Sequence, residues 1–360
     1  GVCSSCIAYE KRGDIDWDYR RHEFLEIVEK YRDKTGYHHD CIVPVSGGKD
    51  STFQVIKILQ LGLNPLCVVA MTDSLSDIGR RNIQNIKNLG VDCLEVTTNP
   101  VIRRKINKLT LFQVGDISWA EHITIYTIPV RVAVQQRIPL IIWGENPQNE
   151  YGGPAGSENN PTVDRKWLEE FGGLLGLRVT DLPGQSEIED KHLINYRYPS
   201  DEELDDVGVS ALFLGHFFPW EGHNNHLLAQ SYGFESWGNV VEGHMLDYEN
   251  LDNLQAGIHE YFMYLKFGFG RATSQANMLI RRGRMTREDA IEIVKRCEGR
   301  FPSAYLGQKL ETILAEIDVV TEEFTNLCDQ YTNRQIFRCD NADKLIKDSS
   351  GSLIKTNYDN

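Results

Sequence analysis

The residues at positions 46–51 have the types and the spacing needed to bind a phosphate group. Glycines let the backbone approach an anion closely, and the free N–H groups at a helix start point toward it. Serine hydroxyls can donate further hydrogen bonds, and a lysine adds a positive charge. A tight turn between a strand and a helix is the simpler alternative, but such a turn needs fewer of these features. The six residues are Ser46, Gly47, Gly48, Lys49, Asp50 and Ser51.

Two common nucleotide-binding loops do not fit this segment. A Walker A loop requires Gly at position 43 and Ser or Thr at position 50, where the chain has Val43 and Asp50. The only comparable glycine pattern elsewhere, at residues 268–273, lacks the third glycine of a dinucleotide-binding fingerprint. Both alternatives are therefore excluded.

The loop does resemble the PP-loop, S-G-G-x-D-S, of the ATP pyrophosphatases. The resemblance implies that ATP is cleaved between its α- and β-phosphates, with the loop holding the pyrophosphate portion together with Mg²⁺. Asparagine synthetases, GMP synthetases and tRNA-thiolating enzymes share this loop. The loop alone thus implies a type of chemistry and leaves the substrate open.

Alternating strands and helices around the loop predict an α/β fold with a doubly wound parallel sheet. Short buried apolar runs predict the strands, whereas helical spacing of apolar residues predicts the helices. We expect the helix at 116–136 to be kinked or split at Pro129. The predicted strands are 41–45, 65–71, 91–98, 139–146 and 211–218, and the predicted helices are 18–34, 52–62, 80–90, 116–136, 286–299 and 309–331.

The chain length of 360 residues allows two domains or one large domain with additions. We expect a loop-like, partly zinc-ribbon-like segment at 1–15 and a PP-loop domain at 16–245. A polar, glycine- and proline-rich insertion at 149–206 interrupts that domain. A helical region at 246–360, for the substrate or a partner, completes the chain.

Charge and composition exclude several classes of protein. The formal net charge of −14 argues against general nucleic-acid binding, which needs clustered cations. No apolar run approaches the roughly 20 residues of a membrane helix, and no signal peptide is visible. Eight cysteines, several of them in apolar stretches, indicate reduced thiols and a cytoplasmic protein.

Four further stretches extend the resemblance along nearly the whole chain to the N-acetyl sugar amidotransferases of bacterial surface-polysaccharide (O-antigen) and flagellin-glycan pathways. The family converts the acetamido group of a nucleotide-activated sugar, typically a UDP-linked diacetamido uronic acid, into an acetamidino group. ATP activates the amide oxygen as an adenylate, and a glutaminase subunit supplies ammonia together with a cyclase-like subunit. The stretches are GVCSSCIAYEKRGDIDWDYRRHEF, IIWGENPQNEYGG at 141–153, LGHFFPWEGHNN at 214–225, and residues 246–291.

Residues at strand ends complete the predicted site, since ligands of doubly wound sheets bind at the carboxyl ends of strands. With Lys49 and Asp50, we expect Glu145 and Asn146 to be catalytic, holding Mg²⁺ or the reacting amide; helix capping is the alternative. Gly144 is expected beside ATP. Thr72 and Asp73 are adenosine contacts by the resemblance or turn residues otherwise, and Glu150 and Tyr151 are predicted substrate or lid contacts.

A cluster of cations near the C-terminal third predicts a second binding function. Lys266 and Arg271, with Arg281 and Arg282, place positive charge on an otherwise acidic chain. Such a cluster suits the diphosphate or carboxylate of a sugar nucleotide. A solvated helix face is the alternative.

Two sets of side chains are of the types that bind metal ions. Cys3 and Cys6 form half of a tetrahedral zinc site, and relatives carry another C-x-x-C upstream, which implies a structural zinc ion in the full-length protein. His216, His223 and His226 lie in a segment that we expect to be loop-like, where a polar or substrate-pocket role is favoured over metal binding.

Two rival functions remain at this point. A tRNA-thiolating PP-loop enzyme would need a basic surface and a sulfur-carrying cysteine near the loop. A scaffold protein that keeps the loop only as a turn would not need Ser46, Asp50 and Ser51 intact. The predicted function is therefore an ATP-dependent amidotransferase acting on a nucleotide sugar.

Overall fold

The computed structural model describes residues 4–145, 172–349 and 351–356. The chain divides into two compact units. The sheet unit comprises Gly1–Thr72, Asp77–Pro100 and Ala120–Glu235, and the helical unit comprises Asp73–Ser76, Val101–Trp119 and Ser236–Asn360. Asn146, Glu150, Tyr151 and Cys3 lie outside the described residues.

The sheet unit is built on five parallel strands among the residues described, in the order β3-β2-β1-β4-β5. The central strand β1 pairs with both neighbours, so that Ile42 lies beside Leu66 on one side and Ile141 on the other. This arrangement confirms the predicted fold class. The strands are β1 Cys41–Pro44, β2 Pro65–Ala70, β3 Asp92–Val96, β4 Leu140–Trp143 and β5 Ser210–Phe213.

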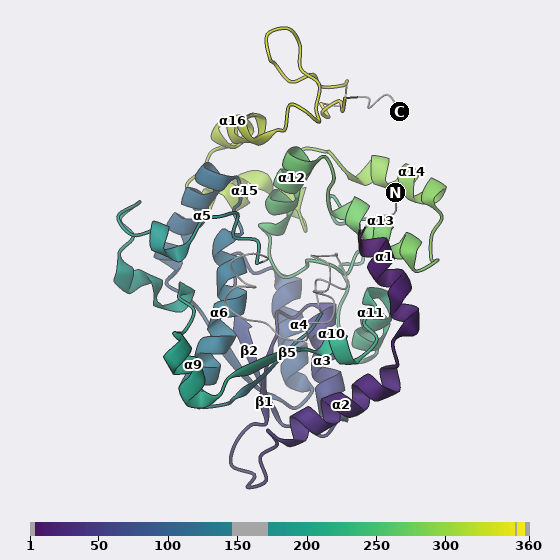
Figure 1. Cartoon of the computed structure of the whole chain (residues 1–360). Coiled ribbons are helices and arrows are strands. Elements are labelled where there is room, and N and C mark those ends of the chain that lie inside the picture. Colours follow the sequence, from purple (N-terminus) through teal and green to yellow (C-terminus); the bar gives the residue numbers. More distant parts are fainter. Residues whose placement is uncertain (1–3, 146–171, 350, 357–360) are drawn as a thin grey trace. The chain divides into compact units, whose positions relative to one another are not determined.

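Apolar side chains on both faces of the sheet form the core of this unit, as expected for parallel strands that helices cover on both sides. Ile128, Val130 and Ala133 of α6 pack with Ile42 and Trp143 on one face. Figure 1 shows α6 and α9 on one side of the strands and α3 on the other. The helices are α2 Trp17–Glu29, α3 Lys49–Gln60, α4 Asp77–Asn88, α6 Trp119–Gln136, α9 Asp201–Val207, α10 Leu214–Phe217 and α11 Gly222–Ser231, with 3-10 turns Val179–Asp181 and Asp190–Tyr196.

Three predictions for the sheet unit need correction. The helix α6 is continuous through Pro129, so the predicted split is wrong, and the alternative of a kink stays a prediction. The predicted strand 211–218 ends at Phe213, where the chain turns into α10. The segment that carries His223 and His226 is the helix α11 rather than a loop, and Glu221 caps it by accepting from the backbone N–H groups of His223 and Asn224.

The N-terminal segment also differs from the expected loop. Ser4–Lys11 forms the helix α1, followed by a 3-10 turn at Arg12–Asp14. Cys6 lies within α1. The next helix, α2, is capped by Asp16, whose carboxylate accepts from the Tyr19 N–H.

The helical unit consists mainly of helices, as predicted for the C-terminal region. Thr286 caps α14, accepting from the Asp289 N–H at 3.1 Å. The elements are α5 Pro100–Val114, α12 Ala256–Phe267, α13 Arg271–Arg281, α14 Arg287–Cys297, the short hairpin β6 Ala304–Tyr305 and β7 Gln308–Lys309, α15 Leu310–Ala315 and α16 Thr321–Tyr331.

Two elements of this unit were not anticipated. The single helix predicted at 309–331 is wrong, because the chain breaks between α15 and α16 and Asp318 adopts a left-handed φ of 53°. The helix α5 was not predicted. Its buried face includes Arg103 and Asn107 beside Ile102 and Ile106, so polar residues interrupt the apolar stripe that signals a helix.

None of the helices in the described part of the chain is both long and apolar enough to cross a membrane.

Candidate active site

The predicted phosphate loop connects the end of β1 to the start of α3. The strand order reverses beside β1, because β2 and β3 lie on one side of it and β4 and β5 on the other. At such a reversal the connections leave a crevice at the carboxyl ends of the two central strands. The residues after β1 and after β4 border this crevice.

Gly47 explains why the loop needs glycine. Its φ of +90° is a conformation that other residues rarely adopt, and an added Cβ would lie 2.9 Å from Ile83 Cγ1 of α4. The following residue, Gly48, is the N-cap of α3 and provides no side-chain cap. The first turn of α3 therefore presents backbone N–H groups and the positive end of the helix dipole, an arrangement that fits a phosphate.

Lys49 and Asp50 form an ion pair at the start of α3. Lys49 Nζ lies 2.6 Å from Asp50 Oδ2, and the lysine side chain is only 8% exposed. The other carboxylate oxygen of Asp50 accepts a hydrogen bond of 2.8 Å from Asn225 Nδ2. Neighbouring side chains therefore hold both oxygens of Asp50. The Asp50 side chain is nevertheless 30% exposed, so the group still faces solvent. The serine hydroxyls stay within the loop, where Ser46 Oγ accepts from the Gly48 N–H and Ser51 Oγ donates to the Gly48 carbonyl.

Asn225 is a residue of the site that the sequence did not single out. It is 1% exposed and lies on α11, which packs against α3. The quoted stretch LGHFFPWEGHNN contains it, but only the helical form of the segment places its amide at Asp50. To find Asn225 from the sequence, the segment of α11 would have had to be identified as a helix.

Gly144 and Glu145 follow β4. A Cβ on Gly144 would lie 3.1 Å from both Gln54 Oε1 and a ring carbon of Trp220, so the glycine permits the close approach of these side chains. Glu145 is half-buried, and its charge adds to the burial that raises the pKa of Tyr126. Carboxylates such as Asp50 and Glu145 are oxygen ligands of the kind that Mg²⁺ prefers.

Thr72 and Asp73 follow β2 and mark a boundary between the two units. Asp73 belongs to the helical unit, where its Oδ2 lies 3.2 Å from Arg103 Nε and accepts 3.0 Å from Asn107 Nδ2. Burial raises the pKa of Asp73 despite the neighbouring guanidinium. The adenosine contact expected of these two residues stays a prediction.

Lys266 and Arg271, the predicted substrate cations, are both engaged within the helical unit. Lys266 Nζ donates to the carbonyls of Val114 and Gly115 at 2.6 and 2.9 Å, which satisfies the C-terminal end of α5. Arg271 Nε donates to Glu260 Oε1 at 2.8 Å. Their role in substrate binding stays a prediction.

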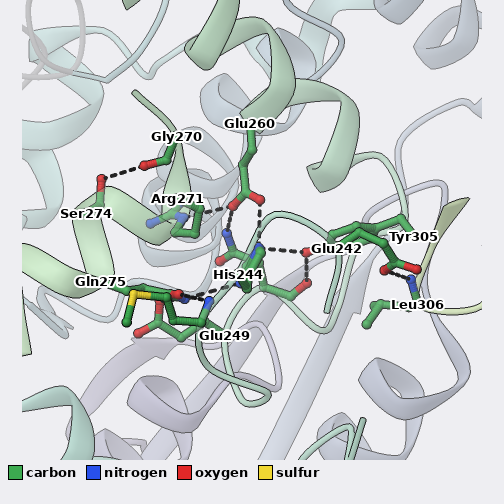
Figure 2. Close-up of polar contacts among 12 residues, drawn as sticks. Glu242, His244, Glu249, Glu260, Gly270, Arg271, Ser274, Gln275, Tyr305 and Leu306 are labelled. Atoms are coloured by element: carbon green, nitrogen blue, oxygen red, sulfur yellow. Dashed lines mark hydrogen bonds and ion pairs between the residues drawn. The ribbon is translucent and has the colours of Figure 1, made fainter. Parts of the chain in front are cut away.

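Glu260 is the centre of a buried polar network (Figure 2). His244 Nε2 lies 2.7 Å from Glu260 Oε2, and Asn250 Nδ2 donates to the same carboxylate. Burial alone would raise the pKa of Glu260, but His244 and Arg271 outweigh it and lower the pKa to about 2. Gln275 extends the network by contacting His244 Nδ1 at 3.2 Å and Glu249 at 2.9 Å. Sequence patterns alone do not reveal this network, because its residues come from several segments.

The histidines considered as metal ligands lie on two helices, with His216 on α10 and both His223 and His226 on α11. His216 is buried against Arg20 and Phe217, and burial together with the Arg20 charge lowers its pKa to about 4. His226 lies on α11 with its ring 5.9 Å from that of Phe234. Among the described residues, no group of three or more His, Cys, Asp or Glu side chains is arranged to hold a metal ion.

A comparison with known protein families finds a match for one region of the chain. Residues 236–349 match the family model described as "LPS biosynthesis protein WbpG-like, C-terminal domain". No curated protein matches the chain. This family match agrees with the resemblance to bacterial surface-polysaccharide proteins.

Solved structures show only a limited overall likeness. NMN synthetase from Francisella tularensis is 10% identical, with a TM-score of 0.37 over 78% of this chain and 92% of its own. An NH3-dependent NAD synthetase from Campylobacter jejuni is 12% identical, with a TM-score of 0.29 over 63% and 100%. A predicted tRNA methyltransferase subunit from Methanocaldococcus jannaschii is 12% identical, with a TM-score of 0.28 over 74% and 93%.

Proposed function

We propose that the chain is the synthetase subunit of an ATP-dependent amidotransferase of bacterial surface-glycan biosynthesis, such as that of lipopolysaccharide O-antigen. It converts an acetamido group of a nucleotide-activated sugar into an acetamidino group. The observation that carries the proposal is the loop at residues 46–51, which joins β1 to α3 and presents Lys49 and Asp50 at the N-terminus of that helix. The WbpG-like match of residues 236–349 supports the surface-glycan assignment.

The need for ATP follows from the chemistry of the acetamide. An amide carbonyl carbon is a poor electrophile, and its oxygen is a poor leaving group. In the proposed reaction the amide oxygen attacks the α-phosphorus of ATP, pyrophosphate leaves, and an O-adenylated imidate forms. Ammonia then adds to the imidate carbon, AMP leaves with the former amide oxygen, and loss of a proton gives the neutral amidine.

The residues of the loop can bind and orient the reactants. The backbone N–H groups of the first turn of α3 and the Ser46 hydroxyl are donors for the pyrophosphate oxygens. Lys49 supplies a positive charge, and Asp50 and Glu145 are the carboxylates that would hold Mg²⁺. Such positioning and charge stabilisation carry most of the catalysis in transfers of this kind.

Ammonia is expected from separate subunits. The sequence contains no Cys-His glutaminase signature that we recognise, so the proposal includes a glutaminase and a cyclase-like partner. Ammonium salt should replace them in a reaction with the isolated chain. This substitution makes the proposed reaction testable without knowledge of the partners.

The test combines the chain, Mg²⁺, ATP and ammonium salt with a UDP-linked diacetamido uronic acid. We expect AMP and pyrophosphate to form only with the sugar present, and the sugar to lose the mass of an oxygen atom and gain that of an NH group. A matched reaction replaces the sugar with bulk tRNA. AMP formation stimulated by tRNA instead of the sugar, or no turnover with a panel of UDP-N-acetyl sugars, would overturn the proposal.

A further inference from the structure

The helical unit contains a pocket that the proposed reaction does not yet use. Its volume is about 270 Å³, near the lower end of the range of about 300–1,000 Å³ for small-molecule sites. The segments 240–244, 257–271 and 296–303 line it. It therefore lies entirely within residues 236–349, which match the WbpG-like family.

The floor of the pocket is held rigid by the Glu260 network. Glu260 is 5% exposed and is bound by Arg271, His244 and Asn250. Figure 2 shows the Glu260 carboxylate pointing toward His244 and Arg271. Because Arg271 offsets the Glu260 charge, the floor adds little net charge to the pocket.

Aromatic rings provide one wall. Tyr261, Tyr264 and Phe301 line the pocket, and the rings of Tyr261 and Phe301 meet edge to face with centroids 5.9 Å apart. Phe301 is 40% exposed, although it is a large apolar side chain. A flat ring of a ligand can stack on such side chains, and stacking of a nucleobase contributes about 1–3 kcal/mol.

The exposed rim of the pocket carries two arginines. Arg296 and Arg300 line the pocket, and both are exposed. Arg296 Nε donates to the Glu292 carbonyl, whereas no hydrogen bond or ion pair joins Arg300 to any residue that the structure describes. Glu298 and Glu242 also line the pocket, and each accepts one backbone N–H, from Thr273 and Leu306 respectively. The rim can therefore pair with an anionic ligand.

We propose that this pocket binds the nucleoside diphosphate part of the nucleotide-activated sugar. The base packs against Tyr261 and Phe301, and the phosphates pair with Arg296 and Arg300, which present the forked donors that suit phosphate oxygens. The pocket is too small for a complete nucleotide sugar, so the sugar projects out of it. This assignment rests on the proposed function in one respect, that the substrate is a nucleotide sugar.

The test measures binding of UDP to the full chain by isothermal titration calorimetry, with no turnover required. We expect Arg296→Glu and Arg300→Glu each to weaken UDP binding by at least about tenfold, since each removes a charged hydrogen-bond donor and adds a repulsive charge. Phe301→Ala should weaken it by about tenfold through lost stacking. Arg287→Glu is the matched control, because it is also an exposed arginine of α14 but lies outside the pocket, and it should leave UDP binding unchanged.

Two further ligands test whether the pocket recognises phosphate groups alone or a nucleotide other than UDP. Pyrophosphate, which lacks the base, should bind much more weakly than UDP, and ADP should bind without sensitivity to Arg300→Glu. Unchanged UDP affinity in both arginine variants, or UDP bound no better than pyrophosphate, would overturn the pocket. ADP binding as strong as that of UDP and equally weakened by Arg300→Glu would overturn the assignment to a nucleotide sugar.

Failure of the pocket and failure of the proposed function give different results. If UDP binds as expected but no sugar is converted, the pocket stands and the amidotransferase reaction fails. If the sugar is converted with an unchanged KM in Arg296→Glu and Arg300→Glu, the reaction stands and the pocket is wrong.

Discussion

Asp50 in the sheet unit and Glu260 in the helical unit are each paired with a cation and with an asparagine side chain. Lys49 and Asn225 hold Asp50, and Arg271 and Asn250 hold Glu260. Their surroundings differ, because the Asp50 side chain is 30% exposed whereas that of Glu260 is 6% exposed.

This difference in exposure separates a group that can change partners from one that cannot. Solvent or a ligand can replace a neighbour of Asp50, since the carboxylate lies at the open start of α3. Neither solvent nor a ligand can replace a neighbour of Glu260 in this way. The loss of one partner would leave a buried charge unpaired. The same type of pairing thus leaves an accessible carboxylate in one unit and forms a buried framework in the other.

Removal of the Glu260 carboxylate should have the largest effect on stability. Glu260→Ala leaves Arg271 and His244 without their buried acceptor and should lower the free energy of unfolding by about 3–5 kcal/mol. Denaturant titration followed by tryptophan fluorescence measures this free energy of unfolding. Glu292→Ala, at an exposed position paired with Lys295, is the control and should cost less than about 1 kcal/mol. A loss of similar size in both variants would contradict the framework role.

The Asp50 site should show the opposite balance between activity and stability. Asp50→Ala and Lys49→Ala should each reduce AMP formation by about 10²–10³-fold, because Lys49 supplies a positive charge at the reacting phosphates and Asp50 would hold Mg²⁺ beside them. Asp50→Ala should cost less stability than Glu260→Ala, because the Asp50 carboxylate is partly solvated, although the 8% exposed Lys49 loses this partner.

Lys57→Ala is the control for these variants. Lys57 lies on the same helix, where its Nζ contacts Gln60, and its removal should leave AMP formation unchanged. Full activity of Asp50→Ala and Lys49→Ala would remove the loop from the mechanism.

Acid titration sharpens the comparison further. The pKa of Glu260 is lowered from its ordinary value near 4.5 to about 2, so the unfolded chain binds this proton more readily. The stabilisation by Glu260 is therefore complete above pH 4.5 and declines as the pH falls toward 2. By pH 3 about 2 kcal/mol of it should be lost.

The measurement compares unfolding free energies of the wild type and of Glu260→Gln between pH 6 and pH 3. The difference between them should shrink as the pH falls. A difference that stays constant over this range would show that Glu260 is not ionised in the folded protein, contrary to its pairing with Arg271.

The sequence was sufficient for the features that depend on neighbouring residues. The strand, loop and helix at residues 41–60 follow from local patterns, and Gly47 occupies the left-handed conformation for which a glycine is needed. The parallel sheet followed from the alternation of strands and helices.

Features that depend on distant residues could not be read in the same way. Asn225 reaches Asp50 only because α11 packs on α3, and Glu260 gathers its neighbours from several segments. A left-handed residue, Asp318, divided the long helix predicted at 309–331, although its apolar spacing continues across the break. Pairing across the fold is set by packing, which local spacing does not encode.

The smallest expected effect concerns Asn225, which we regard as a positioning residue for Asp50. Asn225→Ala removes one hydrogen bond to a carboxylate, worth about 1.5 kcal/mol, and should lower kcat/KM for ATP by about tenfold. Gln230→Ala is the control, since this exposed amide on α11 lies on the same helix, and it should have no effect.

A double-mutant cycle distinguishes positioning from an independent role. If Asn225 acts only through Asp50, the variant carrying both Asp50→Ala and Asn225→Ala should be no less active than Asp50→Ala alone. Losses that add would mean that Asn225 acts on the reactants by itself. The cycle would then place Asn225 among the groups that touch substrate, and the half-exposed carboxylate would no longer be the centre of the site.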